Sequence, residues 1–315
     1  MAVAALAWSA TSPVAASTPS TPYVPTRIDA PDSPPLRWGE RLVSASLPGP
    51  LGGNPVTPGD LDGDNVNDFW TAAPFMPIGG NPNQGRVYAV SGRTFKVIYR
   101  IDAPVVLPAD NAAFGFYIST PGDLTGDAKP DIVVGTDAQN VVVNPALGGC
   151  TSPAAPEPNG CNENQGAAWV FDGANGAPLF ALTNPLPQGS ATPNNSARFG
   201  SRIGRAGDIN NDNVPDIIVG ASNQDVCNTV SCANAVSLSA VTAGTQANAG
   251  NLACGNVTPI PAGCGQNQGQ AFIFSGANGS LLRTLDLPAA DQVPTSTTAC
   301  TANCGNFGLA VQSPG

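Results

Sequence analysis

Three aspartate-rich segments have the residue types and spacing of metal-binding loops. They run GDLDGDNVND from Gly59, GDLTGDAKPD from Gly122 and GDINNDNVPD from Gly207, and they align without gaps. Counted from the first aspartate, positions 1, 3, 5 and 9 of each loop carry an oxygen-bearing side chain. Calcium prefers about six to eight hard oxygen ligands, and position 7 of such a loop usually offers its backbone carbonyl. The spacing therefore predicts calcium as the cofactor, with about three ions in all.

The expected ligands follow from this spacing. They are Asp60, Asp62, Asp64, Val66 and Asp68 in loop one, Asp123, Thr125, Asp127, Lys129 and Asp131 in loop two, and Asp208, Asn210, Asp212, Val214 and Asp216 in loop three. Position 7 (Val66, Lys129 or Val214) would bind through its carbonyl oxygen. Loop two departs most from the pattern, because Thr125 is a neutral ligand and Lys129 adds a positive charge.

An EF-hand and a metal-free turn are the competing interpretations of these loops. An EF-hand needs a glutamate at position 12, where the chain has Thr71, Val134 and Val219, and a helix after it, where the chain has β-type runs. A polar Asx-turn needs no ion. Without one, however, the clustered carboxylates would repel one another. Recurrence in three copies favours a metal, and calcium is favoured over magnesium, which demands rigid octahedral geometry.

The composition excludes several classes of function. The chain has no histidine, which removes Ser-His-Asp and Cys-His nucleophile systems and histidine-ligated zinc. A formal net charge of −10 argues against nucleic acid or an anionic membrane surface as a partner. No apolar run approaches the length of about 18 residues that a membrane span needs, so none is expected.

Eight cysteines, an even number, favour disulfides in an oxidising compartment. They form close sequence pairs, which are Cys150 with Cys161, Cys227 with Cys232, Cys254 with Cys264, and Cys300 with Cys304. Free thiols and metal ligation are the alternatives, and the connectivity from Cys227 to Cys264 stays open. We therefore expect a protein that is secreted or displayed at the cell surface.

Residues 1–35 have the composition of a leader followed by a linker. Met1 to about Ala16 is small and apolar but lacks the positive first region of a signal peptide, so a truncated signal and a disordered leader both remain open. The residues that follow are rich in proline, serine and threonine, which is typical of a linker.

Two further elements recur in step with the acidic loops and would position them. A hairpin pattern begins with Gln-Gly at Gln84, Gln165 and Gln268, and its turn reads SGRT, DGANG or SGANG. A Phe-Gly element stands nine residues before loops two and three, at Phe114 and Phe199.

The Phe-Gly element recurs at Phe307, and Trp38-Gly39 resembles a first copy. Each repeat then offers about four strands, which predicts an all-β chain built of four-stranded β-propeller blades. We expect propeller repeats over 36–315, at about 36–105, 106–190 and 191–290, with a partial copy at 300–315. The acidic loop of the last copy would begin one residue beyond the chain, so a truncated sequence is expected.

The succession of Phe-Gly, the D-x-[DNT]-[GN]-D-x-x-x-D loop and then VVGT or IVGA resembles the FG-GAP repeat of integrin α-subunit propellers and their bacterial relatives. The resemblance covers roughly residues 36–315. It implies a propeller of seven blades whose calcium ions are structural and whose opposite loops help to recognise ligands. Fewer than half of the seven repeats are present, so a closed ring would need further sequence or self-association.

Three classes of function are open at this point, and one of them is a purely structural fragment without a ligand of its own. The favoured one is an extracellular adhesion or ligand-binding scaffold without catalytic activity, whose partner is a protein or glycan bound through the insertions at 137–164 and 222–267. The alternative is an accessory or partial domain of a secreted hydrolase that works with paired carboxylates. The acids outside the loops, such as Glu157, Asp172 and Asp291, show no recurring partner, which favours the scaffold.

Overall fold

The computed structural model describes eleven stretches of the chain. They are residues 41–44, 59–104, 112–142, 161–162, 164–189, 197–227, 251–252, 264–265, 267–287, 307–308 and 311. The predicted leader and linker, Trp38-Gly39, most of the two insertions and all eight cysteine side chains lie outside the described part, and the predictions that concern them stay predictions.

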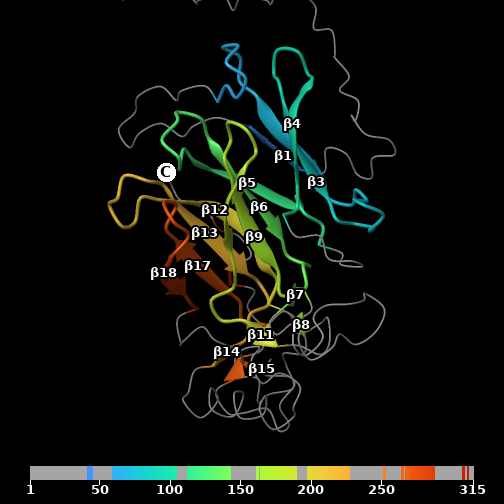
Figure 1. Cartoon of the computed structure of the whole chain (residues 1–315). Helices are drawn as coiled ribbons and strands as arrows, with labels where there is room; N and C mark the ends of the chain where they lie inside the picture. The colour runs from blue at the N-terminus through green and yellow to red at the C-terminus, as the bar shows by residue number, and fades with distance from the viewer. Residues whose placement is uncertain are drawn as a thin grey trace, which may run out of the picture.

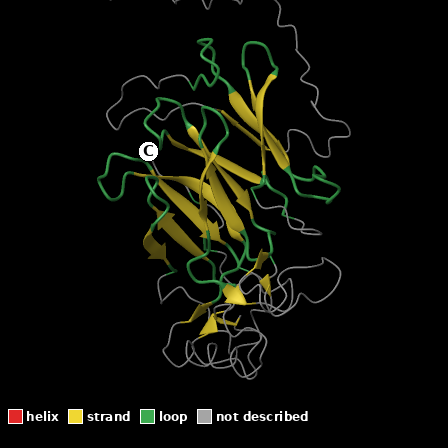
Figure 2. Ribbon diagram, in the orientation of Figure 1, coloured by secondary structure: helices red, strands yellow, loops and turns green. Residues whose placement is uncertain are grey.

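Three four-stranded antiparallel sheets follow one another along the chain (Figures 1 and 2). Sheet one contains β1 (Arg41–Ser44), β2 (Phe69–Ala73), β3 (Arg86–Val90) and β4 (Val97–Asp102), in that order. Sheet two contains β5 (Tyr117–Gly122), β6 (Asp131–Thr136), β9 (Ala167–Phe171) and β10 (Pro178–Leu182), in that order. Sheet three contains β12 (Phe199–Gly207), β13 (Asp216–Ala221), β17 (Gln270–Phe274) and β18 (Leu281–Leu285), again in chain order.

Three two-stranded ribbons accompany these sheets. They pair β7 (Val141–Val142) with β8 (Cys161–Asn162), β14 (Val226–Cys227) with β16 (Cys264–Gly265), and, in parallel, β11 (Gln188–Gly189) with β15 (Asn251–Leu252). The first two leave the main sheets between the strand after an acidic loop and the Gln-Gly hairpin. This is where the sequence places the insertions.

The sheets stack face to face because their middle strands are apolar on both sides. Strand β6 is buried along its whole length. Its Val134 packs toward sheet one, with Trp70 and Phe114, whereas Val133 packs toward sheet three, with Phe199 and other residues of that sheet. Successive side chains of a strand point to opposite faces, so a run such as DIVVGT suits a strand with a neighbouring sheet on each side. The outer strands β10 and β18 are mostly exposed.

Backbone hydrogen bonds between the two predicted elements join sheet one to sheet two and sheet two to sheet three, and the same bond recurs at Phe307. The amide of Phe114 donates to the carbonyl of Gln84 at 3.0 Å, and Phe199 and Phe307 donate in the same way to Gln165 and Gln268, at 2.9 and 2.8 Å. The neighbouring Gly85 has φ +87°, and a Cβ there would lie 2.2 Å from the carbonyl oxygen of Phe114. Glycine follows glutamine in the motif because only glycine permits this approach.

The predicted all-β class is confirmed, and the stacked four-stranded antiparallel sheets are consistent with a β-propeller-like domain. No helix in the described residues is long and apolar enough to cross a membrane.

Candidate metal loops

The three acidic loops share one backbone conformation. Position 6 is left-handed in each, with φ of 63° at Asn65, 66° at Ala128 and 66° at Asn213. Position 4 is left-handed as well, and it is glycine in loops one and two and Asn211 in loop three. Asparagine and glycine adopt this region most readily. The residue types between the acids therefore make a compact turn in which the side chains at odd positions can gather.

The first aspartate of each loop caps that turn. In loop one, Asp60 accepts the backbone N–H groups of Gly63 at 2.7 Å and Asn65 at 2.6 Å. Asp123 accepts from Gly126 and Ala128 in the same manner, and Asp208 accepts from Asp212 and Asn213. The backbone of each loop therefore curves around the carboxylate at position 1.

The aspartate at position 5 is linked to the backbone at position 7. The amide of position 7 donates to the position 5 carboxylate at 2.8 Å in all three loops, from Val66 to Asp64, from Lys129 to Asp127 and from Val214 to Asp212. At position 3, the Thr125 hydroxyl donates to Asp123, whereas the Asn210 side-chain amide donates to Asp212. The structure thus places the predicted ligands of each loop within one turn, and their roles as ligands stay predictions.

The last aspartate of each loop fastens the loop to a hairpin that comes much later in the chain. Asp68 accepts from Leu61 N at 2.6 Å with one oxygen and from Gly92 N at 2.9 Å with the other. Asp131 accepts from Leu124 and Gly173, and Asp216 from Ile209 and Gly276, in the same arrangement. All three carboxylates are buried. Position 9 therefore joins the acidic loop, the strand that follows it and the turn of the Gln-Gly hairpin.

The glycines on the other side of this contact are required by the geometry, although they are absent from the predicted ligand sets. A Cβ on Gly92, Gly173 or Gly276 would lie 1.9, 1.7 or 1.9 Å from the backbone carbonyl oxygen at position 8 of the loop. Only a residue without a side chain lets the hairpin turn approach closely enough to donate its N–H to the aspartate. The available signal was the glycine that recurs eight residues after the glutamine of each hairpin motif.

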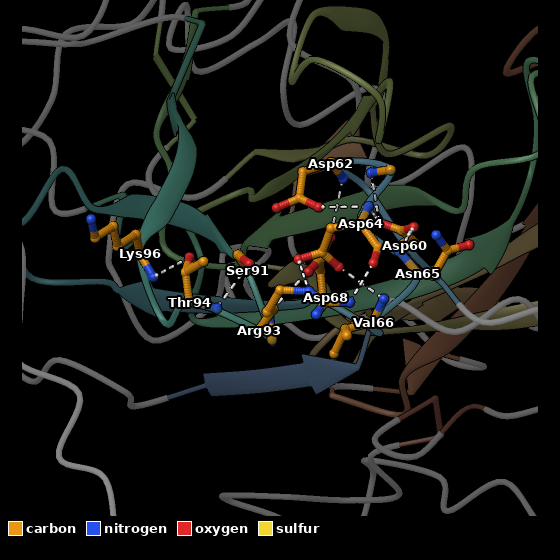
Figure 3. Close-up of polar contacts among 12 residues, drawn as sticks. Asp60, Asp62, Asp64, Asn65, Val66, Asp68, Ser91, Arg93, Thr94 and Lys96 are labelled. Atoms are coloured by element: carbon orange, nitrogen blue, oxygen red, sulfur yellow. Dashed lines mark hydrogen bonds and ion pairs between the residues drawn. The ribbon is translucent and has the colours of Figure 1, made fainter.

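Loop one gathers its carboxylates most closely. One oxygen each from Asp60, Asp62 and Asp68 lies within 4.8 Å of the other two. Figure 3 shows these side chains together in the loop. Among the described residues this is the one group of three acidic side chains that close. Asp68 is buried, Asp60 half-buried and Asp62 exposed, so the group opens to solvent on one side. Three converging hard oxygens fit a calcium ion, which binds carboxylates and carbonyls.

Burial and backbone hydrogen bonds shift the pKa values of several loop carboxylates. Burial raises the pKa of Asp68 and of Asp216 above the ordinary range, although backbone N–H groups act in the opposite direction. The effect is largest for Asp131, where burial, opposed by bonds from Gly173 and Leu124, raises the pKa to about 6. Burial also acts on Asp60, but bonds from Asn65, Gly63 and Asp64, together with the charge of Lys129, outweigh it and lower the pKa.

The comparisons with known proteins point to integrin α subunits. The chain is 24% identical over 189 residues to integrin alpha-E of Mus musculus and 28% identical over 144 residues to integrin alpha-IIb of Homo sapiens. These matches include 59% and 38% of this chain. The chain is related in sequence to integrin α subunits. It spans only 15% and 13% of the length of those two relatives.

Comparisons with family models and with solved structures do not extend this relationship. No protein-family model matches the chain. A solved structure of BBS1N in complex with ARL6DN, soaked with lead, aligns with 90% of this chain and 69% of its own at 11% identity, but its TM-score is 0.22. The relationship to integrin α subunits therefore rests on the sequence matches and agrees with the repeated loops and stacked sheets.

Proposed function

We propose that this chain is a calcium-stiffened binding scaffold of the integrin-α type that works outside the cell, binds a protein or glycan ligand and catalyses no reaction. The loop architecture carries the proposal, because the same pattern of carboxylates and backbone donors occurs three times. In loop one the oxygens of Asp60, Asp62 and Asp68 converge within 4.8 Å. The sequence relationship to integrin α subunits supports the adhesion part.

The residues present fit calcium by their chemistry. The converging donors are carboxylate oxygens, with no nitrogen or sulfur among them. Bringing ionised carboxylates together costs free energy that a divalent cation offsets. Because position 9 also holds the following strand and the hairpin turn, an ion at the loop would stiffen three elements of its sheet at once.

We further propose that the three sheets are blades of a propeller. Their face-to-face stacking supports this arrangement, and further blades or a second copy of the chain would complete the ring. Ligand recognition would fall to the insertions at 137–164 and 222–267, because loops carried by a rigid scaffold are the usual binding elements.

Calcium titration of chelator-treated protein by isothermal titration calorimetry, with thermal melts alongside, tests the proposal. We expect about three sites with dissociation constants of about 10⁻⁴ M or tighter, as in extracellular modules, and a higher melting temperature in calcium. Asp212→Ala should remove one site and lower the melting temperature in calcium. A folded protein that binds no calcium would contradict the proposal and return attention to an enzymatic role.

A further inference from the structure

Two basic side chains from outside the loop hold loop one. Arg93 lies in the turn between β3 and β4, and its Nε donates to Asp64 Oδ2 at 2.9 Å while a second guanidinium nitrogen donates to the Asp64 carbonyl at 2.6 Å. Lys129 belongs to loop two of the next sheet, and its ammonium group donates to the carbonyl of Leu61. Figure 3 shows Arg93 reaching the acidic side chains from the turn that also carries Thr94 and Lys96.

Arg93 engages one of the predicted calcium ligands. Asp64 stands at position 5 of loop one, yet it is absent from the converging group of Asp60, Asp62 and Asp68. One of its oxygens is committed to Arg93 and the other accepts the Val66 amide. A cation that uses Asp64 must therefore compete with a guanidinium group that already neutralises it.

Lys129 acts on the same loop through charge. Its ammonium group donates to the backbone carbonyl of Leu61, the residue next to Asp60. An ammonium group this close stabilises ionised carboxylates when no ion is bound. The same group repels an incoming divalent cation.

Neither basic residue belongs to the common repeat. At the position of Arg93, the hairpins of sheets two and three carry Ala174 and Ala277. At the position of Lys129, loops one and three carry Val66 and Val214. Contacts from these two cations are therefore particular to loop one. The other repeats show which residues can replace them, alanine for Arg93 and valine for Lys129.

We propose that Arg93 and Lys129 are built-in counter-cations of loop one, which hold it together without calcium and lower its affinity for calcium. The inference rests on the proposed function, in which loop one binds calcium. The two cations would make loop one a low-affinity site. Loop one would therefore bind calcium only at higher concentrations than a loop without them. Substituting a residue with a purely structural role would weaken both the ion-free fold and calcium binding. Substituting a counter-cation instead lowers the stability of the ion-free fold and raises the affinity of the loop for calcium.

The test uses Arg93→Ala, Lys129→Val and the double variant in the full chain. In chelator, each variant should melt at a lower temperature than the wild type, because the carboxylates of loop one lose a neutralising charge. In calcium titrations at low salt, each single variant should lower the loop-one dissociation constant about three- to tenfold. This gain in affinity should be smaller in 0.5 M sodium chloride, where the screening length is about half its physiological value. Lys96→Ala is the control, because it removes an exposed positive charge from the same turn.

Loop one is identified within the titration by Asp62→Ala, which should remove its transition. In that background Arg93→Ala should leave the remaining calcium transitions unchanged. If the wild type binds calcium but Arg93→Ala and Lys129→Val leave that affinity unchanged or weaken it, this inference is overturned and the proposed function stands. Absence of calcium binding in every form would overturn the proposed function and this inference with it.

Discussion

At the scale of single residues, the aspartate at position 9 connects three elements of its sheet. In all three loops its two oxygens accept N–H groups from the loop and from a distant hairpin turn, and the carboxylate is buried. The protein thus places a group that prefers water at the junction of three elements. The cost of that burial is visible in the raised pKa values of Asp68, Asp131 and Asp216.

Asp131 makes the ion-free protein sensitive to pH. Its pKa in the folded state is raised to about 6 from the ordinary value of 3.8, so folding favours the protonated form. This contribution to stability is present below pH 4 and is lost as the pH rises through 6. In chelator, the free energy of unfolding attributable to Asp131 should fall by roughly 2 kcal/mol between pH 4 and pH 7.

Denaturant unfolding in chelator at several pH values measures this effect. Asp131→Asn should flatten the decline, because the amide does not ionise. Saturating calcium should reverse it, since an ion favours the charged carboxylate. Equal pH profiles of the wild type and Asp131→Asn in chelator would show that burial of Asp131 has no such consequence.

At the scale of elements, the acidic loop and the Gln-Gly hairpin form one unit. The hairpin turn approaches the loop so closely that a Cβ on Gly173 would lie 1.7 Å from the carbonyl oxygen of Pro130. The contact brings the Gly173 amide to Asp131 at 2.8 Å. Loop and hairpin therefore stabilise each other, although 42 residues separate the two partners.

Gly173→Ala should separate these two elements. We expect it to destabilise the protein by about 3 kcal/mol or more, because backbone must move and a buried carboxylate loses a donor. Gly126→Ala is the matched comparison, since Gly126 has φ +81° and nothing within 4 Å of its added Cβ. That change should cost only the strain of a left-handed alanine, about 1–2 kcal/mol. Urea unfolding of both variants checks the order, and a cost for Gly126→Ala equal to or above that of Gly173→Ala would contradict the close-approach argument.

At the scale of the whole molecule, sheets one and two are joined by a partly buried pair of hydrogen bonds. The indole nitrogen of Trp70 donates to the Tyr99 hydroxyl at 3.2 Å, and that hydroxyl donates to the Gly173 carbonyl at 2.6 Å. Burial raises the pKa of Tyr99, so the hydroxyl remains a donor over the whole physiological range. The corresponding residue on β10 is Phe180, whose ring meets Gly279 of the next sheet without a hydroxyl.

Tyr99→Phe should weaken the junction between sheets one and two. The loss of one hydrogen bond, with the Gly173 carbonyl left without its donor, should cost about 1–2 kcal/mol. Hydrogen exchange of β4 and of the 172–176 turn should quicken, while β17 and β18 should keep their rates. Unchanged exchange at β4 would show that apolar packing, as at Phe180, is sufficient here.

Much of the architecture could be predicted from local sequence. The spacing of Asp60, Asp62 and Asp68 indicates a turn whose oxygens converge, because positions within a short loop are tied by the chain itself. The same spacing predicts Asp64 in that group, whereas in the structure Arg93 holds it outside the group. The Phe-Gly element, the β-branched run after each loop and the two strands of each Gln-Gly hairpin together indicate four strands in each repeat. The pairing of Phe-Gly with Gln-Gly across sheets was not predicted, since the sequence shows both motifs but not that they meet.

The sequence alone therefore determined the all-β class, the repeat and the residues that could bind calcium, since each depends on residue types at short and regular spacing. Only the tertiary structure decided which distant groups meet those residues. Asp68 receives the amide of Gly92, Asp64 is held by Arg93 from 29 residues away, and Leu61 receives Lys129 from 68 residues away. These contacts depend on how strands pair and how sheets stack, and residue types at short spacing do not specify which distant groups become partners.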